Sequence, residues 1–213
     1  MIKKLFLVIA TLFLTFNLFA QYKPFQFGFR VAPDVGWLKV DSEGLSSKGA
    51  KGGMRWGFVA DYYFVENYGF STGFNIISTK GSYKFDYGNH NIKRKFSERY
   101  IEIPFLLRMR TDDLGKIRIC GEIGYGLGVR MSGKDELHNE NGDEFHSTDY
   151  PSFKPIRSSL VISLGFEYNV FESSYLTAAL VFDDNFSNLL KDNASQNHDV
   201  KANTIALEIG FLF

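Results

Sequence analysis

The stretch Asn203-Thr204-Ile205-Ala206-Leu207-Glu208-Ile209-Gly210-Phe211-Leu212-Phe213 alternates bulky apolar residues with small or polar ones. Successive side chains of an extended strand point to opposite faces. One face of this stretch is therefore apolar, and it consists of Ile205, Leu207, Ile209, Phe211 and Phe213. A tilted strand of about 9 to 11 residues is long enough to cross a bilayer. The stretch predicts a membrane-crossing β-strand.

Residues 1–20 have the features of a secretory signal peptide. Lys3 and Lys4 precede an apolar run that ends at Phe16, and the small residue Ala20 comes before Gln21. This order is typical of signal peptides. The apolar run is shorter than the roughly 18 residues of a spanning helix, and no later stretch reaches that length. We therefore expect a signal peptide at 1–20 and one exported domain at 21–213.

The composition agrees with an exported, β-rich domain. Aromatic residues make up 16% of the chain, and there are 20 glycines and only 5 prolines. The single Cys120 excludes an internal disulfide, and we interpret it as a small residue in a packed strand. A formal net charge of zero argues against a nucleic-acid partner, since such proteins need a basic face.

The same alternation recurs in eight segments. They cover residues 25–38, 53–65, 68–83, 98–110, 116–131, 156–170, 175–187 and 203–213. The connections are in turn long and short: 39–52, 84–97, 132–155 and 188–202 are long and polar, whereas 66–67, 111–115 and 171–174 are tight. Outer-membrane barrels have short periplasmic turns and longer extracellular loops. We predict an all-β fold, an eight-stranded antiparallel transmembrane β-barrel built as an up-and-down meander, with both termini in the periplasm.

One face of every segment carries the large apolar side chains. An eight-stranded barrel has an interior just wide enough to be filled by side chains, so this many aromatics fit only on the outside. We expect this face to meet lipid, with aromatic residues near the two interfaces. These are Trp37, Trp56, Tyr62, Tyr68, Tyr168 and Tyr175. A soluble, lipocalin-like barrel turned the other way round is the alternative.

The opposite face carries glycines and charged residues. Its cations are all arginine, which is suited to buried, bidentate pairing with carboxylates. We predict that ion pairs fill the lumen and leave no open pore, with the glycines making room for the long side chains. The predicted network consists of Arg30, Asp34, Arg55, Asp61, Glu102, Arg108, Arg118, Glu122, Arg130, Arg157, Glu167, Asp183 and Glu208. A register error of one residue in any strand would exchange its two faces.

Ile101-Glu102-Ile103-Pro104-Phe105-Leu106-Leu107-Arg108 resembles the IPLLLK-type fourth strand of the PorT-like outer-membrane β-barrel proteins, and Tyr68-Gly69-Phe70-Ser71-Thr72-Gly73-Phe74 resembles the strand before it. The resemblance implies an outer-membrane barrel of a Gram-negative bacterium, and partners in a secretion system that exports proteins to the cell surface. It marks no functional residues. The last strand resembles the terminal signal that the barrel-insertion machinery reads. Pro104 lacks a ladder donor, which predicts weakened pairing there.

The sequence predicts no catalytic, cofactor-binding or metal-binding site. The four histidines fall in the long polar connections: His90, His138, His146 and His198. His198 beside Asp199, with Ser187 or Ser195 as nucleophile, is the arrangement nearest to that of a lipid-modifying enzyme. Neighbours in sequence imply no such geometry, so we do not expect an enzyme.

Two of the long connections carry opposite charges. Residues 80–99 contain six basic and two acidic residues, a net +4, and residues 132–154 contain two basic and six acidic residues, a net −4. They could form a mutually closed cap, or a basic site for lipopolysaccharide phosphates beside an acidic patch, or they could simply be solvated. We expect an interaction protein that works through its loops in contact with outer-membrane lipid. A lipid-modifying enzyme and a small-solute channel are the alternatives.

Overall fold

The computed structural model describes residues 24–40, 45–47, 49–87, 90–138, 153–190 and 200–213. The expected signal peptide at 1–20 lies outside these residues. The strands are β1 (Phe25–Val40), β2 (Leu45–Ser47), β3 (Lys51–Val65), β4 (Tyr68–Tyr87), β5 (His90–Arg110), β6 (Ile117–His138), β7 (Ile156–Phe171), β8 (Ser174–Asn185) and β9 (Val200–Leu212).

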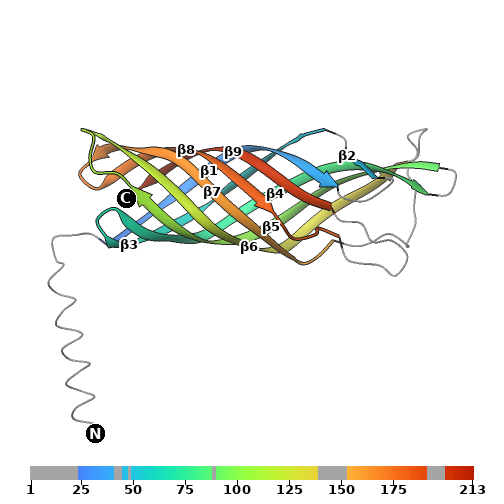
Figure 1. Ribbon diagram of the computed structural model, residues 1–213, viewed down its shortest axis with the longest axis horizontal. Coiled ribbons are helices and arrows are strands. Elements are labelled where there is room, and N and C mark those ends of the chain that lie inside the picture. Colours follow the sequence, from blue (N-terminus) through green and yellow to red (C-terminus); the bar gives the residue numbers. More distant parts are fainter. Residues whose placement is uncertain (1–23, 41–44, 48, 88–89, 139–152, 191–199) are drawn as a thin grey trace, which may run out of the picture.

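The strands form one antiparallel sheet that closes on itself (Figure 1). β1 pairs with β3 on one side and with β9 on the other, and the β4–β5 pairing completes the ring. The short β2 lies within 39–52, which was predicted to be a loop, and it pairs with the end of β4. The eight-stranded up-and-down barrel predicted from the sequence is confirmed.

No helix among the described residues is long and apolar enough to cross a membrane.

The ladder between β4 and β5 is interrupted at Pro104, as the sequence predicts. Pairing stops at Ser71–Leu106 and resumes at Asn75–Glu102, without a change of register. Proline has no N–H to donate, so the bonds to β4 are lost at this level. Gly73 lies within the interruption with a φ of 147°, and a Cβ there would fall 2.0 Å from a backbone oxygen of β3.

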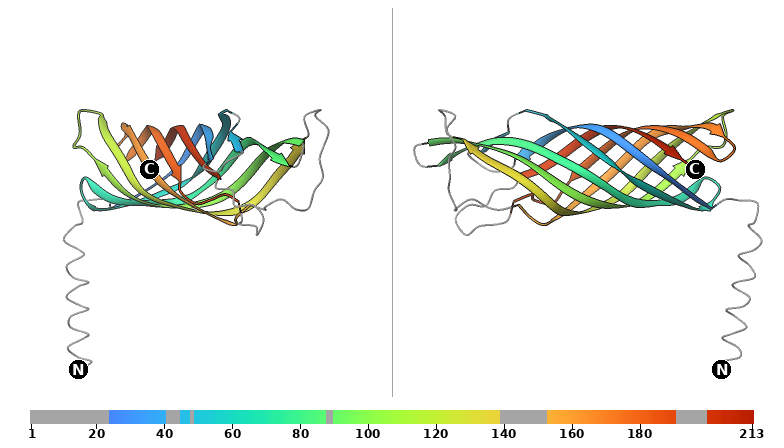
Figure 2. Two further views of the ribbon diagram at one scale, coloured as in Figure 1. Left: turned by 45° about the vertical axis from the view of Figure 1, so that its right-hand side comes forward. Right: turned by 180° about the vertical axis from the view of Figure 1, so that it is seen from behind.

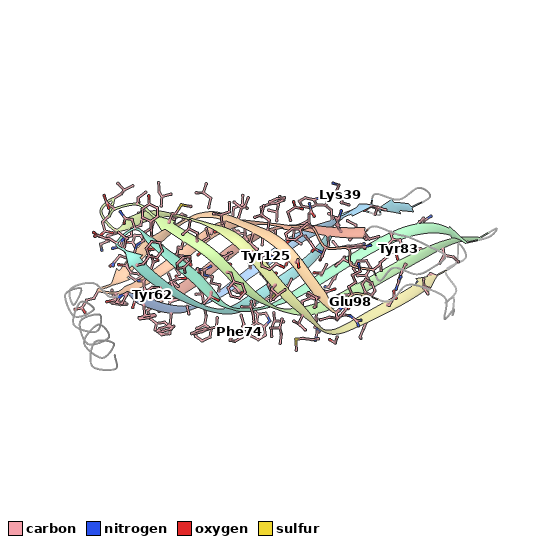
Figure 3. All side chains as sticks on the ribbon, turned by 60° about the horizontal axis from the view of Figure 1, so that its bottom comes forward. Lys39, Tyr62, Phe74, Tyr83, Glu98 and Tyr125 are labelled. Carbon is pink, nitrogen blue, oxygen red and sulfur yellow. The ribbon has the colours of Figure 1, made fainter. Side chains whose placement is uncertain are left out.

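The two faces of the wall differ as expected. Tyr62, Phe74 and Tyr125 project outward (Figure 3), whereas Asp61 of β3 and Glu122 of β6 are buried in the lumen. Tyr175 is the exception among the aromatic residues expected near an interface. Its neighbour Leu176 points outward, so the alternation of β8 turns Tyr175 inward, where it is 6% exposed.

Three strands extend far beyond the others at the end with the long connections. β4, β5 and β6 project past the rest of the wall, and Figure 2 shows this from two further sides (Figures 1 and 2). The prediction of long loops at 84–97 and from residue 132 is therefore wrong. Above the bilayer the outward face meets water, so Lys93 and Lys95 alternate with the buried Ile92 and Phe96. Because the outward side chains of this segment are polar rather than apolar, its sequence resembles that of a polar loop.

A β-bulge marks the base of the extension. Tyr100 pairs with Arg130, but Arg99 pairs with Ser132, so one extra residue, Met131, lies in β6. A one-residue insertion exchanges the faces of the strand beyond it. Below the bulge the odd-numbered residues of β6 point outward, and above it the even-numbered ones do.

Cysteine labelling tests this extension. On a Cys120→Ala background, Lys95→Cys should react with a membrane-impermeant maleimide on whole cells, because its side chain points outward into water. Phe96→Cys should react much more slowly, because this side chain is 4% exposed and packs inside the barrel mouth. Equal labelling at the two positions would show that 84–97 is an open loop.

Candidate functional site

Arg108 of β5 is the centre of a buried cluster near the short turns. Its Nε donates to Tyr63 Oη at 2.9 Å and lies 3.4 Å from Asp61 Oδ2. One terminal nitrogen donates to Glu167 Oε1 at 2.5 Å, and the other bonds Glu122. A single guanidinium thus joins four side chains from three other strands of the wall, β3, β6 and β7.

Arg30 of β1 completes this cluster from the opposite side. It forms a bidentate pair with Glu122, at 2.8 and 3.0 Å, and lies 3.3 Å from Glu208 of the last strand. Bidentate pairs of this kind are among the strongest hydrogen bonds in proteins. The inner cluster consists of Arg30, Asp61, Arg108, Glu122, Glu167 and Glu208.

A second cluster lies nearer to the long connections and is built around Asp183 of β8. Its Oδ2 accepts from Arg157 at 2.5 Å and from Arg55 at 2.9 Å. Arg55 also donates to Thr204 Oγ1 at 3.0 Å, and Glu102 lies 3.7 Å from Arg157. The buried Asp34 experiences the charges of both arginines. The outer cluster consists of Asp34, Arg55, Glu102, Arg157 and Asp183.

Small apolar side chains separate the two clusters. Along β1, Ala32 lies between Arg30 and Asp34, and along β9, Ala206 lies between Glu208 and Thr204. A cavity of about 20 Å³ remains at this level, which is room for about one water molecule. The interior of this part of the barrel is therefore filled by side chains.

Inward-facing glycines provide the space for these side chains. A Cβ at Gly126 would fall 2.9 Å from Glu102 Oε2, and one at Gly210 would fall 3.0 Å from Arg30 Cγ. Real Cβ atoms rarely come this close to other atoms. Larger residues at these positions would push the charged groups out of place.

Arg118 and Arg130 belong to neither cluster, although the sequence analysis grouped them with the lumen residues. Arg118 is at the start of β6 and bonds Asp113 of the adjacent turn. The hydrogen bond from Arg118 holds the pKa of the exposed Asp113 carboxyl below its usual range. Arg118 also lies over the Tyr175 ring at 4.9 Å, while its cross-strand neighbour Glu167 bonds Arg108 instead.

Arg130 lies at the other end of the lumen. It bonds Glu98, a carboxylate that the sequence analysis did not assign to the lumen. Gly133 leaves room for this carboxylate, since a Cβ there would fall 2.0 Å from Glu98 Oε1. Arg130 is partly exposed, and β6 bulges directly after it.

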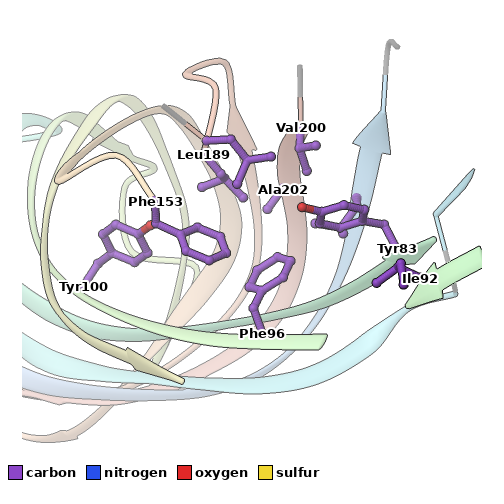
Figure 4. Close-up of a cluster of buried hydrophobic side chains, with 10 residues drawn as sticks. Tyr83, Ile92, Phe96, Tyr100, Phe153, Leu189, Val200 and Ala202 are labelled. Carbon is purple, nitrogen blue, oxygen red and sulfur yellow. The ribbon is translucent and has the colours of Figure 1, made fainter. Parts of the chain in front are cut away.

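An apolar cluster closes the mouth of the barrel above Arg130 (Figure 4). Side chains from strands and from the connecting segments meet there, and Phe96 and Phe153 pack with their ring centres 4.9 Å apart. The mouth cluster consists of Leu38, Tyr83, Ile92, Phe96, Tyr100, Phe153, Leu189, Leu190, Val200 and Ala202. This cluster was not predicted from the sequence, although the even-numbered apolar residues Ile92, Phe96 and Tyr100 indicate an apolar inward face in β5.

The oppositely charged segments meet at this cluster. Arg94 of β5 donates from Nε to Asp135 of β6 at 2.9 Å, and from Nη1 to Tyr83 Oη at 3.0 Å. Its guanidinium lies 5.0 Å from the ring centre of Phe153. Burial raises the pKa of the Tyr83 hydroxyl. This contact corresponds to the closed-cap alternative of the sequence analysis.

The residues considered for lipid chemistry do not form a site among the described residues. His146, Ser195, His198 and Asp199 lie outside them. His90 begins β5 and His138 ends β6, so neither is in a loop as predicted. The Ser187 hydroxyl donates to Asn185 Oδ1 at 2.8 Å and accepts from the Ser158 N–H at 3.0 Å. These bonds give Ser187 a structural role at the end of β8.

A closed antiparallel barrel with an apolar exterior and a charged interior defines an outer-membrane β-barrel protein. Residues 19–191 match the model of the outer membrane protein beta-barrel domain, and the chain belongs to this family. The protein resides in the outer membrane of a Gram-negative bacterium.

One solved structure shows the same fold, and a second is more distantly similar. The crystal structure of Neisserial surface protein A is similar with a TM-score of 0.50 and 14% identity, over 89% of this chain and 96% of that one. The outer membrane protein OprG from Pseudomonas aeruginosa is similar with a TM-score of 0.46 and 14% identity, over 90% and 97%. No curated protein matches the sequence. At 14% identity, the similarity to Neisserial surface protein A shows the fold alone.

Two arginines provide a matched test of the buried network. Arg108→Ala should lower the free energy of unfolding by about 3–5 kcal/mol, because several buried carboxylates lose their partner. Arg118→Ala removes a partly exposed pair at the rim and should cost about 1 kcal/mol or less. Urea unfolding of both variants in detergent micelles, followed by tryptophan fluorescence, measures the difference. Comparable losses would show that Arg108 does not hold a buried network together.

Proposed function

We propose that the protein is a non-catalytic interaction protein whose barrel is sealed and whose extracellular end does the work. The observation that carries this proposal is the filled lumen. Two ion-pair clusters occupy its length, and the mouth cluster lies above them. The working surface is therefore the outside of the molecule, where β4, β5 and β6 form a three-stranded extension beyond the membrane.

We also propose that this extension serves protein secretion or envelope assembly. Support comes from the resemblance of Ile101–Arg108 and Tyr68–Phe74 to the PorT-like proteins. These two segments are paired strands, and they lead directly into the extension. A partner at the cell surface would meet the extension before any other described part of the barrel.

A conductance measurement tests the sealed lumen. The purified protein in a planar bilayer should show no stable, large single-channel conductance, because arginine–carboxylate pairs bridge the interior from opposite walls. A triple-substitution variant that opens the mouth, Phe153→Ala with Leu189→Ala and Leu190→Ala, should also show no conductance, since both ion-pair clusters persist below the mouth cluster. Stable openings of the wild type would favour the small-solute channel.

Gene deletion separates the interaction protein from the lipid-modifying enzyme. Loss of surface proteins from the deletion strain, with an unchanged lipid A mass spectrum, is the expected result. Both are measured on the same cells, by proteomics of the surface fraction and by mass spectrometry of lipid A. A lipid A change that wild type reverses and a His198→Ala variant does not reverse would contradict the proposal.

A further inference from the structure

The outward face of the extension carries a compact group of cations. Lys80 and Lys134 both lie beside Ser97, one on each neighbouring strand. Arg99 and Lys95 lie two residues below and above Ser97 on β5 itself. All four basic side chains are exposed. Adjacent strands are about 4.8 Å apart, so Lys80 and Lys134 are anchored roughly 10 Å from each other. These four residues are named the basic diamond.

The β-bulge and the strand alternation sort the charges of this segment by face. The carboxylate of Glu98 is buried inside and pairs with Arg130, and the exposed carboxylate of Asp135 lies on the inward side of β6, where it pairs with the buried Arg94. None of the four cations of the basic diamond lies within ion-pair distance of a carboxylate among the described residues. Glu136, the cross-strand neighbour of Lys95, is the acidic side chain that shares the outward face there. The outward face is therefore net positive, because Glu98 and Asp135 lie on the inward side of their strands.

The basic diamond begins where the lipid-facing surface ends. Ile76 and Ile101 form a cross-strand pair on the outward face, and the next outward pair is Ser78 with Arg99. Two residues of strand span about 7 Å, less along the membrane normal because the strand is tilted. The headgroup layer of one leaflet is about 5–8 Å thick. Arg99 therefore lies at the depth of lipid phosphates. Lys80 and Lys134 pair with Ser97, two residues farther along the strand, and their long side chains can reach back to this depth.

We propose that the basic diamond binds the phosphate groups of the anionic glycolipid of the outer leaflet, the lipid A part of lipopolysaccharide. Arginine forms bidentate bonds with phosphate, and lysines at its sides act as point charges. The acyl chains of the same lipid lie against the apolar wall below, at Ile76 and Ile101. The site fits a phosphate carried by a lipid, because its apolar and basic parts are continuous. This assignment is independent of the role in secretion.

The test uses the full protein in detergent micelles, titrated with bisphosphorylated lipid A and with dephosphorylated lipid A and followed by native mass spectrometry. Wild type should bind the bisphosphorylated form at least about 10-fold more tightly, since each basic residue at a membrane surface contributes about fivefold. The variant Lys80→Gln, Arg99→Gln, Lys134→Gln should lose this preference. Arg99→Gln alone should weaken binding about fivefold.

The matched control is Lys39→Gln, Lys51→Gln, Lys116→Gln, which removes the same charge from β1, β3 and a turn. It should keep the wild-type preference, and heat-modifiable migration in gels confirms that each variant is folded. Equal binding of both lipid A forms by wild type would overturn the proposal. So would an equal loss in the control variant, which would indicate diffuse charge attraction. Displacement of lipid A by millimolar inorganic pyrophosphate would assign the site to a soluble phosphate instead.

Discussion

The pairing of β1 with β9 is the interaction on which the rest of the molecule depends. Backbone N–H and C=O groups in lipid have no water to bond, so a sheet can cross a membrane only if it has no open edge. Phe27 and Phe213 exchange both backbone hydrogen bonds, at 3.1 and 2.8 Å. The last strand thereby closes the ring at its end nearest the short turns. With eight strands in the wall, closure leaves an interior that side chains must fill.

The small interior explains why the charges are paired across the lumen. Glu122 lies between Arg30 and Arg108, which come from different strands of the wall. Buried ion pairs give little net stability over apolar packing, but an unpaired buried charge is costly. Each residue of the clusters is therefore constrained by its partners. The interior acts as a polar core that fixes the strands relative to one another.

The environment of β4, β5 and β6 changes from lipid to water at the surface of the bilayer. In the membrane, apolar side chains face outward to lipid and charges face inward. Above it, the outward face meets water and the inward face covers the mouth, so Phe96 and Ile92 turn inside and the lysines outside. The bulge at Met131 adjusts β6 to this exchange. The three strands β4, β5 and β6 thus contribute inward to the mouth cluster and outward to a basic surface.

The sequence by itself determined the closed barrel, its strand order and the two faces of each membrane-crossing segment, because alternation with a period of two is local and lipid permits few exceptions. It also indicated that Arg30, Arg108 and Glu122 share the lumen. Only the tertiary structure decided the partners, since Arg118 bonds a nearby turn and Arg94 meets Asp135 through the register of β5 and β6. The extension of β4, β5 and β6 above the bilayer was not predicted for a related reason. Its inward side chains are buried by segments that are distant in the chain, and a local sequence pattern does not show which face those segments will cover.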